Sequence, residues 1–253
     1  MPRVPELRAI PIEGIGEVRP GDDIAALVLV ALRSKRKSLA QGDIIVITHK
    51  VVSKAEGLIV PLASVRPSSD AEQWAEEFHL DSRITQTALD ESARVVKRGH
   101  GVTITETRHG FVCANSGVDA SNVDGGHSVV LLPRDPDRSA QNIYRALKNR
   151  IGFAVPVIIS DSFGRAWREG LTEVAIGLAG MKAFRDSRGA HDPYGYKLKV
   201  TLEAVADELA SMAGLACGKL TRIPACIIRG YAYQPGRGRA RDLIRPAERD
   251  MFR

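Results

Sequence analysis

The sequence has no apolar run long enough to cross a membrane as a helix. Apolar runs such as residues 44–47 and 155–159 have the length of a strand, whereas a membrane-spanning helix needs about 20 residues. The first residues also lack the apolar segment of a secretion signal. We therefore expect a protein without a membrane partner.

Cysteines and aromatic residues are scarce as well. The 253 residues include only Cys113, Cys217 and Cys226, and their spacing is not that of metal ligands. An odd number of cysteines in apolar surroundings is typical of reduced thiols, so we predict a cytoplasmic protein in which Cys113 and Cys226 are core residues. Aromatic residues make up 5% of the sequence, which leaves few side chains for stacking on bases.

The positive charge is concentrated at the C-terminus. The net charge is +6, and residues 229–253, with seven arginines and three acidic residues, account for +4 of it. The remaining chain is nearly balanced, which argues against a nucleic-acid partner. We expect residues 229–253 to form a basic arm that packs on the protein or on a dimer partner through Leu243, Ile244, Met251 and Phe252.

Apolar residues follow the periods of short helices and strands. Helices are predicted at residues 23–34, 72–78, 85–95, 140–150 and 202–216, and strands at 9–12, 44–47, 102–106, 111–114, 129–132 and 155–160. With 44% apolar residues the chain can bury a large core. No linker divides it, so we predict one unit over residues 1–253, a mixed α/β fold with partly parallel sheets and packed helices.

Three polar segments each follow a predicted buried strand. They are residues 50–57, 115–122 and 160–165. If these strands are neighbours, their carboxyl ends bring together Lys54, Asp119, Asn122, Asp161 and Ser162. Carboxylate and hydroxyl oxygens beside a lysine are what Mg²⁺ or Mn²⁺ and a nucleotide require.

Each of these residues taken alone has a simpler explanation. Asp119 is typical of a turn, His49 is typical of a structural residue, and Lys54 is equally consistent with a solvated or a binding lysine. Asp161, at the end of a core strand, favours a ligand or catalytic role. The residues also leave other functions open: a metal-dependent phosphatase or nucleotidyl transferase, or a non-catalytic protein that binds nucleotides or nucleic acid.

A series of short motifs is more specific than any single residue. These are PIEG at 11–14, GDD at 21–23, GDIIV at 42–46, VSKAEG at 52–57, GVDASNV at 117–123, DSFGR at 161–165, DPYG at 192–195 and ADELA at 206–210. Over residues 10–231 the sequence closely resembles the coenzyme F420-0:gamma-glutamyl ligase family. The motifs GKLT at 218–221 and DLIRP at 242–246 resemble its bacterial branch. There the ligase is often fused to a nitroreductase-like domain, and this chain stops before such a domain.

The resemblance implies a GTP-dependent ligase that adds L-glutamate to the deazaflavin coenzyme precursor. It implies an acyl-phosphate intermediate and further gamma-linked glutamates. The expected ions are two divalent cations, Mg²⁺ or Mn²⁺, with K⁺ as a further ion. The expected assembly is an intertwined homodimer with a family-specific fold unlike that of ATP-grasp ligases.

The resemblance also implies roles for particular residues. Asp119, Asp161 and Lys54 are the expected catalytic residues, and Asp119, Asp161 and Ser162 the expected metal ligands. The expected nucleotide-binding residues are Ile15, Gly16, Glu17, Val18, His49, Lys50, Lys54, Asn122, Cys217, Gly218, Lys219, Leu220, Thr221, Arg222 and Ile223. Two of these depart from the family pattern. His49 replaces a small hydroxyl residue, and Lys219 replaces an acidic residue of some archaeal relatives that is a candidate ligand of the second metal.

Overall fold

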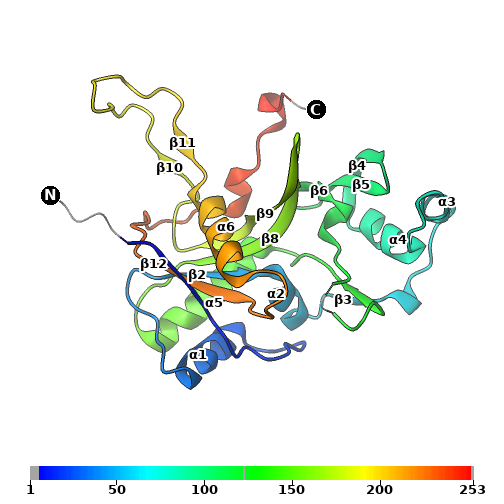
Figure 1. Cartoon of the computed structure of the whole chain (residues 1–253), viewed down its shortest axis with the longest axis horizontal. Coiled ribbons are helices and arrows are strands. Elements are labelled where there is room, and N and C mark those ends of the chain that lie inside the picture. The colour runs from blue at the N-terminus through cyan, green and yellow to red at the C-terminus, as the bar shows by residue number, and fades with distance from the viewer. Residues whose placement is uncertain (1–5, 122, 252–253) are drawn as a thin grey trace.

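A five-stranded sheet forms the centre of the molecule in this computed structural model, which describes residues 6–121 and 123–251 (Figure 1). Its strands, in spatial order, are β1 (Arg8–Pro11), β12 (Ala225–Arg229), β2 (Ile44–Thr48), β8 (Val157–Arg165) and β9 (Arg168–Ala179). The pair β2 and β8 is parallel and the other neighbours are antiparallel. The prediction of a partly parallel α/β fold is confirmed.

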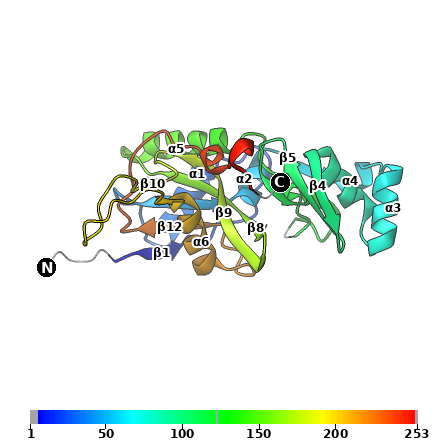
Figure 2. The ribbon, with the colours of Figure 1, turned by 90° about the horizontal axis from the view of Figure 1, so that it is seen from above.

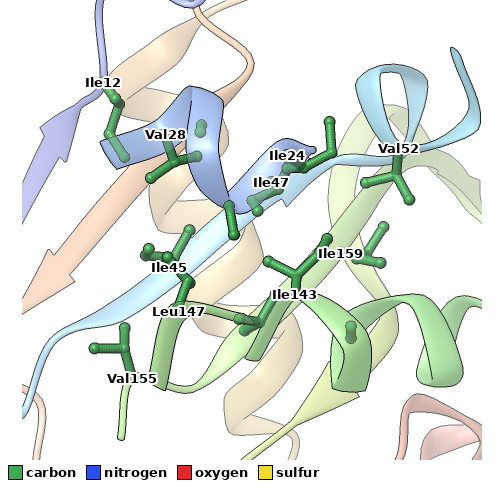
Figure 3. Packing of buried hydrophobic residues seen from close by; sticks show 14 of the residues in the cluster. Ile12, Ile24, Val28, Ile45, Ile47, Val52, Ile143, Leu147, Val155 and Ile159 are labelled. Carbon is green, nitrogen blue, oxygen red and sulfur yellow. The ribbon is translucent and has the colours of Figure 1, made fainter. Parts of the chain in front are cut away.

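Helices cover both faces of this sheet. Helices α1 (Ile24–Ser34) and α5 (Pro136–Ile151) lie on one face, and α6 (Val205–Cys217) lies on the other (Figure 2). In strand β2, Ile45 and Ile47 pack toward α1 and α5 (Figure 3), while Ile44 and Val46 pack toward α6. An all-apolar strand is stable here because neither of its faces meets water.

Smaller elements lie around the central sheet. Helices α3 (Ser69–Phe78) and α4 (Ser82–Asp90) and the sheet of β4 (Ser92–Gly99), β5 (Val102–Thr107) and β6 (Val112–Ala114) form one end of the molecule (Figures 1 and 2). The short pair β3 (Ile59–Pro61) and β7 (Ser128–Val130) lies between this end and the central sheet. Strands β10 (Arg185–Asp186) and β11 (Leu202–Glu203) form the base of an arm that projects from the body. Single 3-10 turns cover Leu62–Ser64, Asn115–Gly117, Ala240–Leu243 and Ala247–Arg249.

Two predicted helices include residues that form strands in the structure. The helix predicted at 85–95 ends at Asp90, and the following residues form β4, which pairs with β5. The helix predicted at 202–216 begins at Val205, because Leu202 and Glu203 pair with β10. In both cases pairing with a consecutive strand outweighs the local helical pattern. None of the helices within the described residues is long and apolar enough to span a bilayer.

The start of the basic arm is anchored on the body. Leu243 and Ile244 pack against the two sides of the core, as expected. The carboxylate of Asp137 in α5 accepts a hydrogen bond of 2.7 Å from the backbone N–H of Ala240. Met251 is 82% exposed in the single chain, so it does not anchor the arm on its own body. Phe252 lies outside the described residues.

Candidate functional site

The site is built around a helix that the sequence reading did not anticipate. Residues 49–55, which the sequence predicted as a polar stretch after a strand, form helix α2 (His49–Ala55), which begins at the residue after β2. Strand β8 also continues past residue 160, so that Asp161 and Ser162 lie within the strand and not in a loop after it. Its extension is stabilised by pairing with β9, which the single-strand pattern could not reveal.

The parallel register brings His49 next to Asp161. Thr48 of β2 is paired with Ser160 of β8. The residues that follow them, His49 and Asp161, therefore lie at the same edge of the sheet. Nε2 of His49 lies 3.2 Å from Oδ1 of Asp161. His49 is buried, and its Nε2 makes no hydrogen bond within the described part of the chain. The partner of this buried nitrogen is therefore the Asp161 carboxylate, in an ion-pair contact outside hydrogen-bond geometry.

Asp119 lies beside Lys50, the residue that follows His49 in α2. The backbone of Asp119 exchanges two hydrogen bonds with Val130 of β7, which fixes its position. Its Oδ2 lies 2.7 Å from Nζ of Lys50, and its Oδ1 accepts a 2.6 Å hydrogen bond from the backbone N–H of Ser121. Burial acts to raise the pKa of Asp119, but the hydrogen bonds from Lys50 and Ser121 outweigh it and hold the pKa below its ordinary value. Asp119 is therefore a carboxylate at neutral pH.

The two predicted metal ligands thus face consecutive residues of α2. Carboxylates are the oxygen donors that Mg²⁺ and Mn²⁺ prefer. Asp119 already has the ammonium of Lys50 on its Oδ2, so a divalent cation shared with Asp161 would have to bind through other carboxylate oxygens or displace this contact. Within residues 6–121 and 123–251, no three His, Cys, Asp or Glu side chains are grouped closely enough to hold a metal ion by themselves. A cation here would complete its coordination with water or phosphate oxygens, as Mg²⁺ usually does. Asn122, predicted to contact the nucleotide, lies outside the described residues.

Lys54 faces the predicted nucleotide segment 15–18. Its side chain is only 8% exposed, and its Nζ lies 2.5 Å from Oε1 of the exposed Glu17. Val18 is buried in the core and Ile15 packs against it. In this segment only Gly16 and Glu17 are exposed, so a bound ligand would meet their backbone and the Glu17 side chain.

The predicted loop 217–223 follows α6 and returns to the start of α2. Gly218 has a positive φ of 66°, a conformation that favours glycine, and Thr221 donates a 2.5 Å hydrogen bond to the carbonyl of Cys217. The backbone N–H of Thr48 donates a 2.8 Å hydrogen bond to the carbonyl of Pro224. The loop therefore ends next to His49. Leu220 is exposed, Arg222 has a positive φ, and the thiol of Cys217 is buried.

Glu173 in β9 is a site residue that the sequence reading missed. It is paired with Ser162 in the β8 and β9 hairpin. Its carboxylate accepts hydrogen bonds from Ser160 Oγ at 2.9 Å and from Ser162 Oγ at 2.5 Å. Lys219 Nζ lies 2.7 Å from Oε1 of Glu173 and also contacts Ser162 Oγ. The signal that could have found Glu173 is the hairpin register, which local periodicity does not give.

The cysteines behave as the sequence predicts. Cys113 in β6 and Cys226 in β12 are buried. Burial raises the pKa of the Cys113 thiol to about 12, and the nearby charge of Asp161 adds to this effect. Cys113 therefore stays protonated and serves as a small core residue.

The fold and the site together indicate a class of protein. A mixed α/β protein that gathers the carboxylates of three chain segments, Glu17, Asp119 and Asp161, around the lysines of one short helix is suited to bind phosphate groups and a cation. The family model for F420-0:Gamma-glutamyl ligase matches residues 14–230. The chain therefore belongs to the F420-0:gamma-glutamyl ligase family.

Relatives of similar length support this assignment. Coenzyme F420:L-glutamate ligase of Methanothermobacter thermautotrophicus is 47% identical over 247 residues, 96% of this chain and 98% of that protein. The protein of the same name from Methanopyrus kandleri is 43% identical over 255 residues, 99% of each chain. The one from Methanocaldococcus jannaschii is 46% identical over 216 residues, 85% of this chain and 86% of that protein.

Proposed function

We propose that the protein is a GTP-dependent ligase that joins L-glutamate to the deazaflavin precursor of coenzyme F420 and then adds further gamma-linked glutamates. Two findings support this proposal. The family match spans residues 14–230, and the named relatives are coenzyme F420:L-glutamate ligases. The main structural observation in favour of this function is that Asp119 and Asp161 lie beside consecutive residues of α2, and that Lys54 belongs to the same helix.

The proposed reaction has two steps. An oxygen of the acceptor carboxylate attacks the γ-phosphorus of GTP, the bond to the bridging oxygen breaks, and GDP leaves. The amine of glutamate then attacks the carbonyl carbon of the acyl phosphate, inorganic phosphate leaves, and the amine loses a proton. Phosphoryl transfer depends mainly on positioning and on neutralising charge, so lysines and cations are the groups the reaction requires.

Individual residues have distinct roles in this proposal. Lys54 binds the triphosphate, because its buried ammonium lies next to segment 15–18 and a lysine binds phosphate as a point charge. Asp119 and Asp161 hold a divalent cation, Mg²⁺ or Mn²⁺, which neutralises phosphate charge when it is bound. Lys50 keeps Asp119 ionised and oriented. Loop 217–223 and K⁺ complete the proposed nucleotide site.

The arm after β10 supports the proposal of a homodimer. Tyr194 and Val200 in this arm are 96% and 86% exposed in the single chain, and the arm stands away from the body (Figure 1). Large exposed apolar side chains on a projecting segment are typical of contacts with another chain. We propose that the arm packs on a second copy, in an intertwined dimer that acts in the cytoplasm.

Mass spectrometry of the product tests the proposed function. The protein is incubated with the deazaflavin precursor, L-glutamate, GTP and Mn²⁺, and we expect the precursor mass to increase by one or more glutamate residues. Omission of GTP should abolish the product. Release of phosphate from GTP at the same rate without glutamate would instead indicate a phosphatase.

A further inference from the structure

The cluster of Ser162, Glu173 and Lys219 contains a positive charge of its own. We propose that the ammonium of Lys219 takes the place of a second divalent cation at this site, so that the chain needs one divalent ion fewer than a site in which both positions bind a metal. The proposal rests on the proposed function, because it gives the ammonium of Lys219 the role of neutralising negative charge on the nucleotide phosphates.

The contacts of Lys219 are those of a bound cation. Its Nζ lies 2.7 Å from Oε1 of Glu173 and contacts Oγ of Ser162, while Ser162 also donates to Glu173 at 2.5 Å. These two oxygens would be the donors for a metal at this position. A lysine ammonium has three donor hydrogens and no lone pair, so it cannot itself bind a metal. A divalent ion on the same oxygens would have to displace it.

The surroundings of Glu173 explain why a cation is held there. The Glu173 side chain is only 13% exposed, and a carboxylate this buried needs a compensating charge. The described residues place Lys219 on it, and the hydroxyls of Ser160 and Ser162 donate to its two oxygens. The set is complete without an added metal ion. The residues at this position therefore do not fit a second divalent cation.

Lys219 occupies a different position from the first cation site. Successive side chains of a strand point to opposite faces, so Asp161 and Ser162 lie on opposite sides of β8. Asp161 faces α2 through His49, and Ser162 faces the loop after α6 through Lys219. The Lys219 side chain is 63% exposed and is carried by the predicted nucleotide loop, so its ammonium can follow a bound phosphate.

Counting bound Mn²⁺ tests this proposal. Equilibrium dialysis of the full chain, with free Mn²⁺ measured by electron paramagnetic resonance, gives the number of ions per chain. We expect Lys219→Met to bind one Mn²⁺ more than the wild-type protein, and Lys219→Arg, which keeps the charge, to bind the same number as the wild type. The additional ion should be lost again in the double variant Lys219→Met, Glu173→Gln. Because Lys219→Arg keeps a positive charge beside the buried Glu173, we expect that variant to keep the wild-type melting temperature, while Lys219→Met should regain it when Mn²⁺ is bound.

Two outcomes would overturn the proposal. One is a Lys219→Met protein that binds no more Mn²⁺ than the wild type. The other is a wild-type protein that loses an ion on the substitution Glu173→Gln, since this would show a metal already bound at Glu173. The count needs neither the precursor nor glutamate. A protein with the expected counts that forms no ligated product would refute the proposed function and leave the role of Lys219 intact.

Discussion

The two sides of strand β8 hold positive charge in different ways. Toward α2, the buried Nε2 of His49 lies beside the Asp161 carboxylate without a hydrogen bond. Toward α6, the Glu173 carboxylate already has an ammonium and two hydroxyls as partners. Although Asp161 and Ser162 are adjacent in sequence, Asp161 faces the side on which we propose a divalent cation, and Ser162 faces the side on which Lys219 supplies an ammonium. Neighbouring residues of one motif therefore need not share one ligand.

The largest expected effect comes from neutralising a carboxylate on the side of β8 that faces α2. We expect Asp161→Asn to fold normally and to lower the ligation rate by at least about 10²-fold, because a bound cation contributes several kcal/mol of charge stabilisation and about 1.4 kcal/mol changes a rate tenfold. Asp119→Asn should act alike. Steady-state rates at saturating Mn²⁺ measure this. The matched control is Asp70→Asn, which removes an exposed ion pair with Arg98 and should leave the rate unchanged. A wild-type rate in either site variant would remove that residue from the site.

Lys54 provides a second test, of nucleotide binding. We expect Lys54→Ala to weaken GTP binding by about 1.5–3 kcal/mol, the usual range for a hydrogen bond to a charged group, which corresponds to roughly 10- to 100-fold in Kd. Titration calorimetry with GTP measures the change. Lys35→Ala, which removes an exposed lysine paired with Glu13, is the control. Equal GTP affinity of Lys54→Ala and wild type would mean that Lys54 does not bind the triphosphate.

The basic arm is expected to stabilise the structure and not to bind nucleic acid. Truncation after Gly230 removes the contacts of Leu243 and Ile244 and the hydrogen bond from Ala240 to Asp137. Since burying one such aliphatic side chain is worth about 1.5–3 kcal/mol, we expect a melting temperature lower by at least about 4 °C, or a lower yield of dimer. Calorimetry and gel filtration check this.

A salt titration of DNA and RNA binding by the full chain completes that test. We expect weak binding at physiological salt. Tight binding with a steep dependence on salt, together with an unchanged melting temperature after truncation, would favour a nucleic-acid partner instead.

The smallest expected effect concerns an ion pair of the scaffold, remote from both sides of β8. The hydrogen bonds from Arg150 in α5 hold the pKa of Asp23, the residue that caps α1, at about 2, below its ordinary 3.8. A lowered pKa stabilises the folded state above the ordinary value, and this stability is lost as the pH falls from about 4 toward 2. Because the pair is about half exposed, we expect less than about 1 kcal/mol. Urea unfolding at pH 4 and pH 2 should show a smaller loss of stability for Asp23→Asn, and an equal loss would contradict this assignment.

Local pattern was sufficient for much of the fold. The all-apolar run at residues 44–47 correctly indicated a buried strand, which the structure covers on both faces. The helix predicted at 85–95 was too long because residues 92–95 pair with β5, about ten residues further along the chain. Such a pairing has no signature in the periodicity of one segment.

The site was predictable in its residue types but not in its pairings. The residues expected at the carboxyl ends of the strands were Lys54, Asp119, Asn122, Asp161 and Ser162. In the structure Asp119 and Asp161 lie beside Lys50 and His49 of α2, Lys54 lies on the same helix, and Ser162 contacts Lys219 on the other side of β8. Glu173 was missed because its role depends on the register of β9 against β8. The contact between Lys219 and Glu173 joins residues 46 positions apart in sequence, and charge pairs at such distances leave no motif.

Transfer of labelled oxygen tests the central claim, ligation through an acyl phosphate, most directly. The precursor is prepared with ¹⁸O in its acceptor carboxylate and is incubated with the protein, L-glutamate, GTP and Mn²⁺. We expect one ¹⁸O atom in the inorganic phosphate for the first amide bond formed on each precursor molecule, because the labelled carboxylate oxygen that attacks GTP leaves with the phosphate. Later additions use the unlabelled carboxylate of the added glutamate, so the label is counted against the product with one glutamate. Amide formation with unlabelled phosphate, or phosphate release without amide formation, would contradict the central claim.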